Sequence, residues 1–192
     1  MTLIEQLERY QPFNEQEEKD REVILRWLKN DPENIYTRNN TAAHMTASAW
    51  VVSPDGERIL MAYHNLYDSW AWLGGHADGD RDLLRVAMKE VRQESGIQDV
   101  KPLSEEIFSL EALCVDGHVK NGSYVSSHIH LNITYLLEAD SNQPVHHREG
   151  ENKAVGWFAR DEVYEKCSEP WFTEHIYRKL NQKLQEQYGR TL

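Results

Sequence analysis

The sequence predicts an α/β (α+β) fold, in which a mixed β-sheet lies between helices as an α/β/α sandwich with an extra N-terminal helix. Three observations predict it: a hairpin-like pair of β runs, a strongly amphipathic stretch over residues 80–94, and later β-like runs followed by a closing amphipathic segment. The length of 192 residues and the 40% hydrophobic content suit one core. We expect a single domain over 1–192, with a helical extension (1–43), a core (44–165) and a C-terminal helix (166–192).

The first expected helix runs from Asn14 to about residue 28. Asn14 and Glu17 form a capping-box pattern, and apolar residues recur on one face behind it. Residues 30–43 are rich in Asn, Asp and Thr and predict a loop. We therefore expect an amphipathic helix that packs on the sheet and is joined to it by this loop.

The hairpin comprises residues 44–52 and 58–64, with the turn sequence Ser-Pro-Asp-Gly between them. The following helix, expected over 80–94, carries an apolar stripe and ends at Gly96, a typical C-cap. Its stripe consists of Leu83, Leu84, Ala87, Met88 and Val91. These two units form the start of the predicted core.

Three further β-like runs are expected over residues 107–115, 127–137 and 154–158. A polar, glycine-containing turn over 118–124 joins the first two. From Trp171 onward, apolar residues at helical spacing predict the closing helix. These runs complete the sheet and its second helical layer.

The acidic composition limits the classes of partner. Twenty-one Lys and Arg against 32 Asp and Glu give a formal net charge of −11, which opposes binding of a nucleic acid polymer. No apolar run approaches the ~18 residues of a membrane span, and no apolar signal segment opens the sequence. The separated cysteines Cys114 and Cys167 suit a reducing compartment. We expect a cytoplasmic protein with no membrane partner.

The chemically informative segment is the glycine-rich stretch 74–80 and the helix after it. Glu90 and Glu94 lie at i and i+4, so both carboxylates leave the same side of the helix. A solvated acidic face is the simpler interpretation, but a glycine loop lets backbone groups approach a ligand. Hard oxygen donors from the loop and two carboxylates predict a Mg²⁺ or Mn²⁺ site.

These residues resemble the Nudix box, G-x5-E-x7-R-E-U-x-E-E-x-G-U, in which U is aliphatic. Gly75, Glu90, Glu94 and Gly96 match the motif, as do the aliphatic positions Val91 and Ile97. The resemblance extends over about residues 44–165, since a tryptophan-bearing strand around Trp157 follows the box as in the family. It implies a Nudix-like fold.

Three positions depart from the motif. Arg81 stands at the family's early glutamate, Lys89 at its arginine and Gln93 at the first of its paired glutamates. Lys89 keeps a cation beside the carboxylates, although without the bidentate fork of arginine. Gln93 removes one carboxylate ligand, so we expect fewer or more weakly bound metal ions.

The resemblance implies divalent-metal-dependent hydrolysis of a pyrophosphate bond in a nucleoside diphosphate linked to another moiety, or in a related organic diphosphate. Gly75, Glu90 and Glu94 are the implied ligands of Mg²⁺, with Mn²⁺ also possible. Glu94, or Glu149 or Glu151 in the later acidic region, is the implied general base. His76, Arg81, Lys89 and Arg148 are candidates for contacting a small phosphorylated substrate.

Two alternatives remain open. A degenerate Nudix domain that binds or senses a nucleotide without cleaving it is motivated by Arg81 and Gln93, although the retention of Glu90 and Glu94 favours hydrolysis. An enzyme similar to isopentenyl-diphosphate isomerases would need Cys114, whose surroundings do not match that family. The sequence leaves the substrate and a possible homodimer undecided.

Weaker features have simpler interpretations. His128 and His130 lie two apart on an expected strand and face the same way, which suits zinc, but no third ligand has metal-site spacing. We interpret them as polar residues on one side of the sheet. Cys114 is expected to be a buried structural residue. Trp70 and Trp72 are expected in the core.

Overall fold

The structure is a computed structural model that describes residues 1–65, 68–120, 122–150 and 152–189. Its helices are α1 (Leu3–Arg9), α2 (Glu15–Asn30), α3 (Leu83–Ser95), α4 (Val163–Lys166), α5 (Pro170–Phe172), the π-helical η1 (Thr173–Tyr177) and α6 (Arg178–Tyr188). Its strands are β1 (Ala43–Val52), β2 (Arg58–His64), β3 (Ser69–Ala71), β4 (Leu73–His76), β5 (Val100–Pro102), β6 (Ser109–Val115), β7 (His118–Lys120), β8 (Ser123–Val125), β9 (His128–Ala139) and β10 (Asn152–Ala159).

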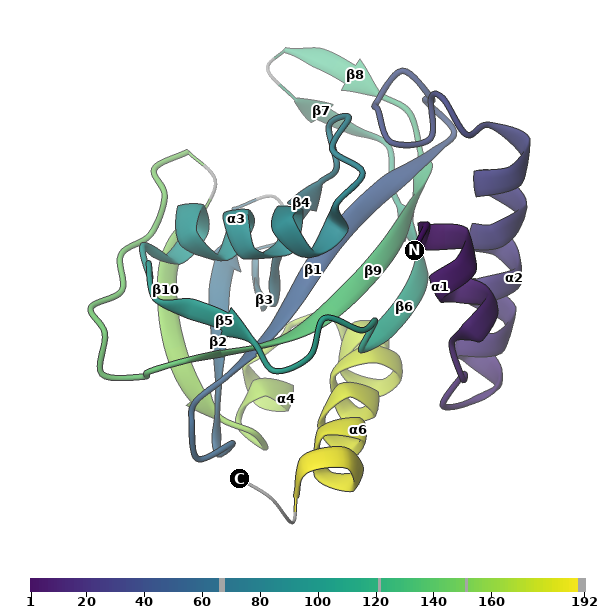
Figure 1. The fold of residues 1–192 in the computed structure, drawn as a ribbon. Helices are drawn as coiled ribbons and strands as arrows, with labels where there is room; N and C mark the ends of the chain where they lie inside the picture. Colours follow the sequence, from purple (N-terminus) through teal and green to yellow (C-terminus); the bar gives the residue numbers. More distant parts are fainter. Residues whose placement is uncertain (66–67, 121, 151, 190–192) are drawn as a thin grey trace.

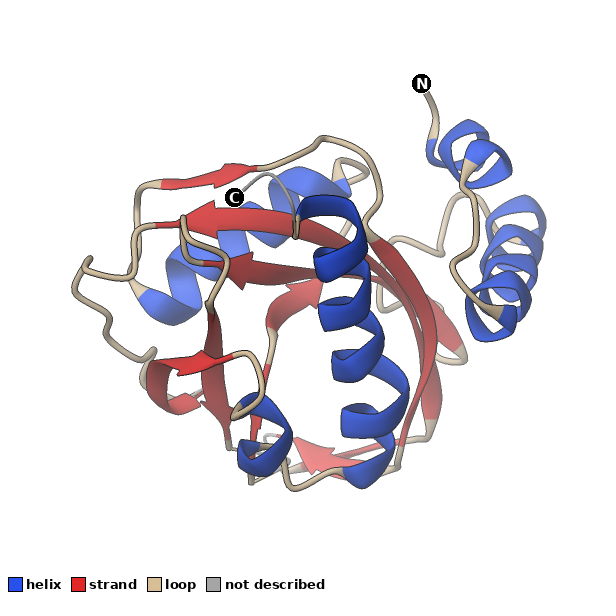
Figure 2. Cartoon of the chain, turned by 90° about the horizontal axis from the view of Figure 1, so that it is seen from below, coloured by secondary structure: helices blue, strands red, loops and turns tan. Residues whose placement is uncertain are grey.

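The central sheet is mixed, as predicted. Its strands follow the order β10-β2-β1-β9-β5, with β3 paired to β2, β4 to β1 and β6 to β9. Strands β1 and β9 run parallel, and the other pairs are antiparallel. Helices α3 and α6 lie on opposite sides of the sheet (Figure 1), and the strands curve around α6 when viewed from below (Figure 2). The predicted fold class, a mixed sheet between helices, is confirmed.

Strand β1 is buried along its whole length and divides the core into two parts. Side chains alternate between the faces of a strand, so Met45 and Val51 pack in the cluster that includes α3, whereas Trp50 and Val52 pack in the cluster that includes α6. Residues 49–52 of β1 are accordingly all apolar, whereas its first half carries the buried polar residues His44, Thr46 and Ser48 on one face.

The hairpin and the helix after it form where the sequence predicts them. Ser53 N donates to the carbonyl of Arg58 at 3.0 Å, which closes the β1–β2 turn. Gly96 ends α3 with φ +76°, the left-handed conformation that favours glycine. The helix starts at Leu83, three residues later than expected, because the Asp82 side chain accepts from Arg85 N and caps it.

Several short elements replace predicted loops. The glycine-rich segment begins as strand β4, where Gly74 and Gly75 pair with Ser48 and Ala47 of β1. A Cβ on Gly74 would lie 2.6 Å from the Ala47 carbonyl oxygen, so only glycine permits this close approach. The predicted turn over 118–124 instead overlaps the short strands β7 and β8, the second of which extends to Val125. Helix α1 lies within a segment for which no helix was predicted, and it has a Thr2–Glu5 capping box.

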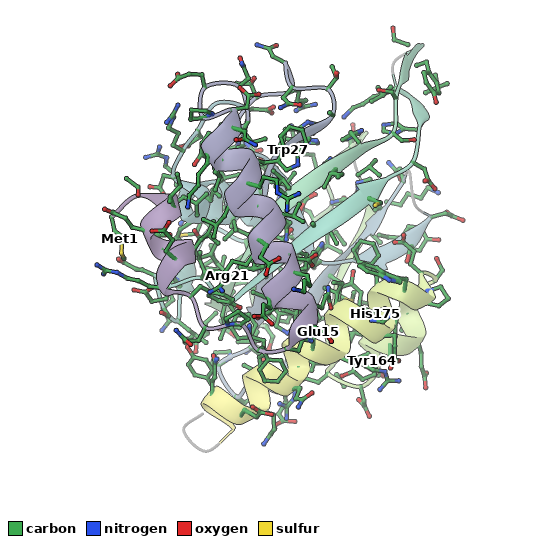
Figure 3. The ribbon with its side chains drawn as sticks, turned by 90° about the vertical axis from the view of Figure 1, so that its right-hand side faces the viewer. Met1, Glu15, Arg21, Trp27, Tyr164 and His175 are labelled. Atoms are coloured by element: carbon green, nitrogen blue, oxygen red, sulfur yellow. The ribbon has the colours of Figure 1, made fainter. Side chains whose placement is uncertain are left out.

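The N-terminal helices are part of the main core. Leu7 of α1 and Ile24 and Leu28 of α2 are buried in the cluster that includes α3, as expected for a helix that packs on the sheet. The N-terminal end of α2, marked by Glu15, lies against α6 (Figure 3). This placement brings Glu17 to Lys183 of α6, with 2.8 Å between Glu17 Oε1 and Lys183 Nζ.

The expectation for Cys114 is wrong, because Cys114 is exposed and only Cys167 of the two cysteines is buried. Its neighbours Leu113 and Val115 face inward, so the alternation of β6 turns Cys114 towards solvent. Trp70 and Trp72 are half-buried and pack against the cluster around α6, in line with a core role.

Candidate active site

The predicted metal ligands meet where α3 packs on β4. The Glu94 side chain is buried, and its Oε2 accepts from the Gly74 N–H at 3.0 Å. Glu90, one turn earlier, has a side chain only 12% exposed. A Cβ on Gly75 would lie 2.8 Å from Glu90 Cδ, so the Glu90 carboxyl group rests on the glycine backbone. Gly75, Glu90 and Glu94 therefore form one compact, oxygen-rich site.

Lys89 partly offsets the negative charge of the two carboxylates. Its Nζ lies 3.0 Å from Glu90 Oε1, and the Lys89 side chain is about half exposed. An ammonium group at this distance reduces the like-charge repulsion that the i, i+4 glutamate pair otherwise creates. Lys89 therefore lies beside the Glu90 carboxylate, as its position in the motif predicts.

The segment 146–152 is tied to the C-terminal half of α3. His146 N donates to the Ser95 carbonyl at 2.9 Å, and Asn152 Nδ2 donates to the Glu94 carbonyl at 3.1 Å. Arg148 Nη1 donates to Gln93 Oε1 at 3.1 Å. These bonds hold the acidic region beside the two glutamates. Glu149 is exposed, and Glu151, the other candidate base, lies outside the described residues.

Arg81 is held by the loop that precedes β1. It donates to the Pro32 carbonyl at 3.0 Å, lies 3.6 Å from Glu33 Oε2 and covers the ring of Tyr36. Its neighbour Asp80 binds the Arg85 guanidinium at 2.6 Å. These contacts fix the entry to α3, and a substrate contact by Arg81 stays a prediction.

His76 lies on the other face of β4. The Cβ direction of Gly75 points to Glu90 of α3, so alternation directs His76 away from α3. Its ring lies 4.8 Å from that of His130 and 5.1 Å from that of His44, measured between centroids. Burial lowers the pKa of His76 to about 3. Its ring contacts make His76, the histidine predicted to contact substrate, one member of a histidine group.

Sequence spacing did not reveal this group. His128 and His130 were visible as an i, i+2 pair, but the strand register adds His44, which lies directly opposite His130 in the parallel β1–β9 pair. His76 enters from β4, opposite Thr46 of β1. Only the sheet topology brings residues 44, 76 and 130 together, and no local motif encodes that topology.

The chemistry of the Gly75, Glu90 and Glu94 donors suits a hard cation. Carboxylate and backbone oxygens are the ligands that Mg²⁺ and Mn²⁺ prefer. The hydrogen bond from the Gly74 N–H orients the Glu94 carboxylate beside the glycine segment. Such a site can hold a cation against the oxygens of a phosphorylated compound.

Comparisons with known proteins agree with this geometry. The model of the NUDIX domain matches residues 42–180. Similar solved structures include a NUDIX-family hydrolase from Clostridium perfringens (18% identity, 72% of this chain and 97% of that chain, TM-score 0.52) and a C. elegans Ap4A hydrolase (15%, 76% and 98%, TM-score 0.53). An ADP-ribose pyrophosphatase from Streptococcus suis is also similar (17%, 75% and 91%, TM-score 0.50). With identities below 25%, these structural similarities show the fold alone.

No curated protein matches the chain. Among its described residues, no helix combines the length and the apolar character that crossing a bilayer requires.

Proposed function

The chain belongs to the Nudix family, and we propose that it hydrolyses a pyrophosphate bond. The substrate is a nucleoside diphosphate linked to another moiety, or a related organic diphosphate. The proposed cofactor is Mg²⁺, for which Mn²⁺ can substitute. The observation that carries the proposal is that Glu90 lies against Gly75 and Glu94 is hydrogen-bonded to the adjacent Gly74 at the β4–α3 junction. Matching motif letters alone would not require these three groups to share one site.

Glu90, Glu94 and the Gly75 backbone are the groups that would hold the cation. When bound, Mg²⁺ neutralises charge on the pyrophosphate oxygens and lowers the pKa of a coordinated water. The Gly74 N–H orients Glu94 by its 3.0 Å hydrogen bond. Lys89 balances Glu90 and, being half exposed, can also contact a substrate phosphate.

In the proposed hydrolysis, water attacks one phosphorus, the bridging P–O bond breaks, and the bridging oxygen leaves with the second phosphate. A carboxylate takes the proton of the attacking water. Glu94, Glu149 and Glu151 are the candidate bases, and the tether between Asn152 and the Glu94 carbonyl places the Glu149 region beside α3. Arg148 lies next to Gln93 and can bind phosphate.

The test is product release from a substrate panel, with Mg²⁺, with Mn²⁺ and with a chelator. The panel contains dinucleotides, nucleotide sugars, nucleoside triphosphates and prenyl diphosphates, because similar structures include an Ap4A hydrolase and an ADP-ribose pyrophosphatase. We expect turnover of at least one class that disappears with chelator and falls about 10²–10⁴-fold in Glu94→Gln. Glu18→Gln, which removes the same charge from an exposed position on α2, should keep full activity.

The second candidate function is nucleotide sensing, favoured by Gln93, which removes a ligand and instead accepts from Arg148. Metal-dependent binding of a panel member without turnover would support sensing over hydrolysis. Rearrangement of a prenyl diphosphate without release of a phosphate product would instead support the isomerase alternative. Equal turnover by wild type and Glu94→Gln would contradict the proposed site.

A further inference from the structure

A group of histidines lies at one end of the sheet, separate from the carboxylate site. The group consists of His44, His76 and His130. One ring nitrogen from each histidine, either Nδ1 or Nε2, can serve as a ligand, and the three nitrogens lie within 4.8 Å of one another. They come from three neighbouring strands, β1, β4 and β9, which converge at the end of the sheet near the β7–β8 hairpin (Figure 1). The pairing of these strands fixes the spacing of the three backbones.

His44 is oriented by the backbone of the preceding loop. Its Nδ1 lies 3.1 Å from the Asn40 carbonyl oxygen, and a carbonyl only accepts, so Nδ1 carries the hydrogen. The other nitrogen, Nε2, is buried and has no hydrogen-bond partner, and the whole residue is only 5% exposed. A metal-binding histidine shows the same arrangement, with one nitrogen held by a carbonyl and a lone pair on the other.

His128 supports His130 in a similar way. The Nδ1 atom of His128 lies 2.8 Å from the Ser126 carbonyl oxygen and therefore carries the hydrogen. Its Nε2 lies 3.1 Å from His130 Nε2, so in a neutral ring it accepts a hydrogen from His130. That contact leaves His130 Nδ1 with a lone pair. His128 is thus placed to orient a ligand.

The chemistry of this group differs from that of Gly75, Glu90 and Glu94. Its donors are imidazole nitrogens from three histidines, whereas the carboxylate site offers oxygen donors. Neutral imidazoles are ligands for Zn²⁺ and similar transition-metal ions, whereas Mg²⁺ prefers oxygen. The two sites therefore select different cations.

We propose that His44, His76 and His130 form a binding site for a divalent transition-metal ion, Zn²⁺ foremost, with Asn40 and His128 orienting the ligands. Three histidines leave the fourth tetrahedral position for water or another ligand. Zn–N bonds of about 2.0–2.1 Å require each nitrogen to move inward by no more than about 1 Å from the observed spacing. The bound ion cross-links β1, β4 and β9 beside the glycines of the carboxylate site.

The first test measures metal binding by the full-length, tag-free chain after treatment with chelator. Titration calorimetry with Zn²⁺ should show one ion per chain that a large excess of Mg²⁺ does not displace. Co²⁺ should give the visible absorption of a tetrahedral site. Zinc X-ray absorption on the wild type should show imidazole nitrogens at about 2.0–2.1 Å. Substoichiometric binding, or an all-oxygen shell, would overturn the proposal.

Variants identify the ligands. His76→Gln and His130→Gln should weaken Zn²⁺ binding by at least about 100-fold, and His128→Gln, which alters an orienting residue, by about 10–100-fold. His147→Gln, at an exposed position outside the group, is the matched control and should bind normally. If a buried variant fails to fold, the wild-type absorption spectrum still decides the ligand set.

Glu94→Gln separates this proposal from the proposed hydrolysis. The variant removes a carboxylate ligand and should lose activity while retaining stoichiometric Zn²⁺ binding. Loss of the zinc site in Glu94→Gln with retention in His76→Gln would assign zinc to the carboxylates and contradict the histidine site.

Discussion

At the level of single residues, the tightest constraint in the candidate active site is the contact between Gly75 and Glu90. A Cβ at position 75 would lie 2.8 Å from Glu90 Cδ and 3.0 Å from its Cγ. We expect Gly75→Ala to displace the Glu90 carboxylate and to reduce metal-dependent turnover by at least tenfold, roughly the effect of disturbing a ligand's support. The fold should survive, because the displaced group ends a flexible side chain.

Gly156→Ala is the matched control for that experiment. The nearest atom to its new Cβ, Phe158 Cζ, lies 3.4 Å away, which is close to ordinary contact. Turnover and metal dependence should match the wild type, with the free energy of unfolding changed by less than about 1 kcal/mol. Wild-type turnover in Gly75→Ala as well would show that the function of Glu90 does not require its contact with Gly75.

Gln93 is one of the three positions that depart from the motif. Its side chain is exposed, and its Oε1 accepts from Arg148 at 3.1 Å. Gln93→Glu adds a carboxylate to the side of α3 that carries Glu90 and Glu94, and more ligand charge strengthens binding of hard cations. We expect the Mg²⁺ concentration for half-maximal activity to fall. A titration that shows no change would place position 93 outside the metal site.

At the level of secondary-structure elements, a buried ionic network joins α2, β6 and α6. Glu17 is fully buried and accepts from Lys183 Nζ at 2.8 Å and from Ser109 Oγ at 2.8 Å. Lys179 lies 3.0 Å from Glu111 and 3.4 Å from Glu17. Glu17→Gln leaves two buried ammonium groups short of negative charge, so we expect a loss of about 3–5 kcal/mol in the free energy of unfolding.

The loss should depend on pH. Burial pushes the pKa of Glu17 up, but Lys179 and Lys183 outweigh it and hold the pKa below the usual 4.5. A depressed carboxyl pKa contributes stability that is present above the unfolded value and is lost as pH falls through the folded one. Denaturant titrations should therefore show the gap between wild type and Glu17→Gln narrowing below about pH 4. Glu8→Gln, from the exposed Glu8–Lys29 pair, should cost at most about 1 kcal/mol.

Local patterns predicted these elements but not the network. Helix α3 was readable from its apolar stripe and from Gly96, whose left-handed conformation ends the helix. Lys179 and Lys183 belong to the predicted closing helix, yet both are buried, whereas isolated lysines normally face solvent. Their partners Glu17 and Glu111 lie far away in the sequence, so no periodicity on α6 could reveal the pairing.

At the level of the whole molecule, the predictable part is the arrangement that follows from local signals and the family motif. The hairpin of β1 and β2, helix α3 and the mixed sheet were predicted, and so was the spacing that brings Glu90 and Glu94 to one side. The histidine group was not, because it depends on the parallel register that places His44 opposite His130. Register between distant strands is a tertiary property and leaves no local sequence pattern.

The hydrophobic core includes residues that lie N-terminal to the family match. The family match begins at residue 42, yet Leu7, Ile24 and Leu28 are buried in the main core. Burial of three such side chains contributes about 5–9 kcal/mol, comparable to the 5–15 kcal/mol of a typical domain. Removal also takes Glu17 from Lys183. We therefore expect a chain of residues 42–192 to unfold or aggregate.

Point variants test the same idea in smaller steps. Ile24→Ala and Leu28→Ala should each lower the free energy of unfolding by about 2–5 kcal/mol, whereas Arg26→Ala, on the exposed side of α2, should change it by less than about 0.5 kcal/mol. Denaturant titration followed by circular dichroism measures the free energy of unfolding of all three variants. A truncated chain that unfolded cooperatively at the wild-type midpoint would make α1 and α2 an appendage. Coincident losses in the truncation and the buried variants would instead make residues 1–41 part of the folding unit, because their side chains complete a core that the sheet and α3 cannot close alone.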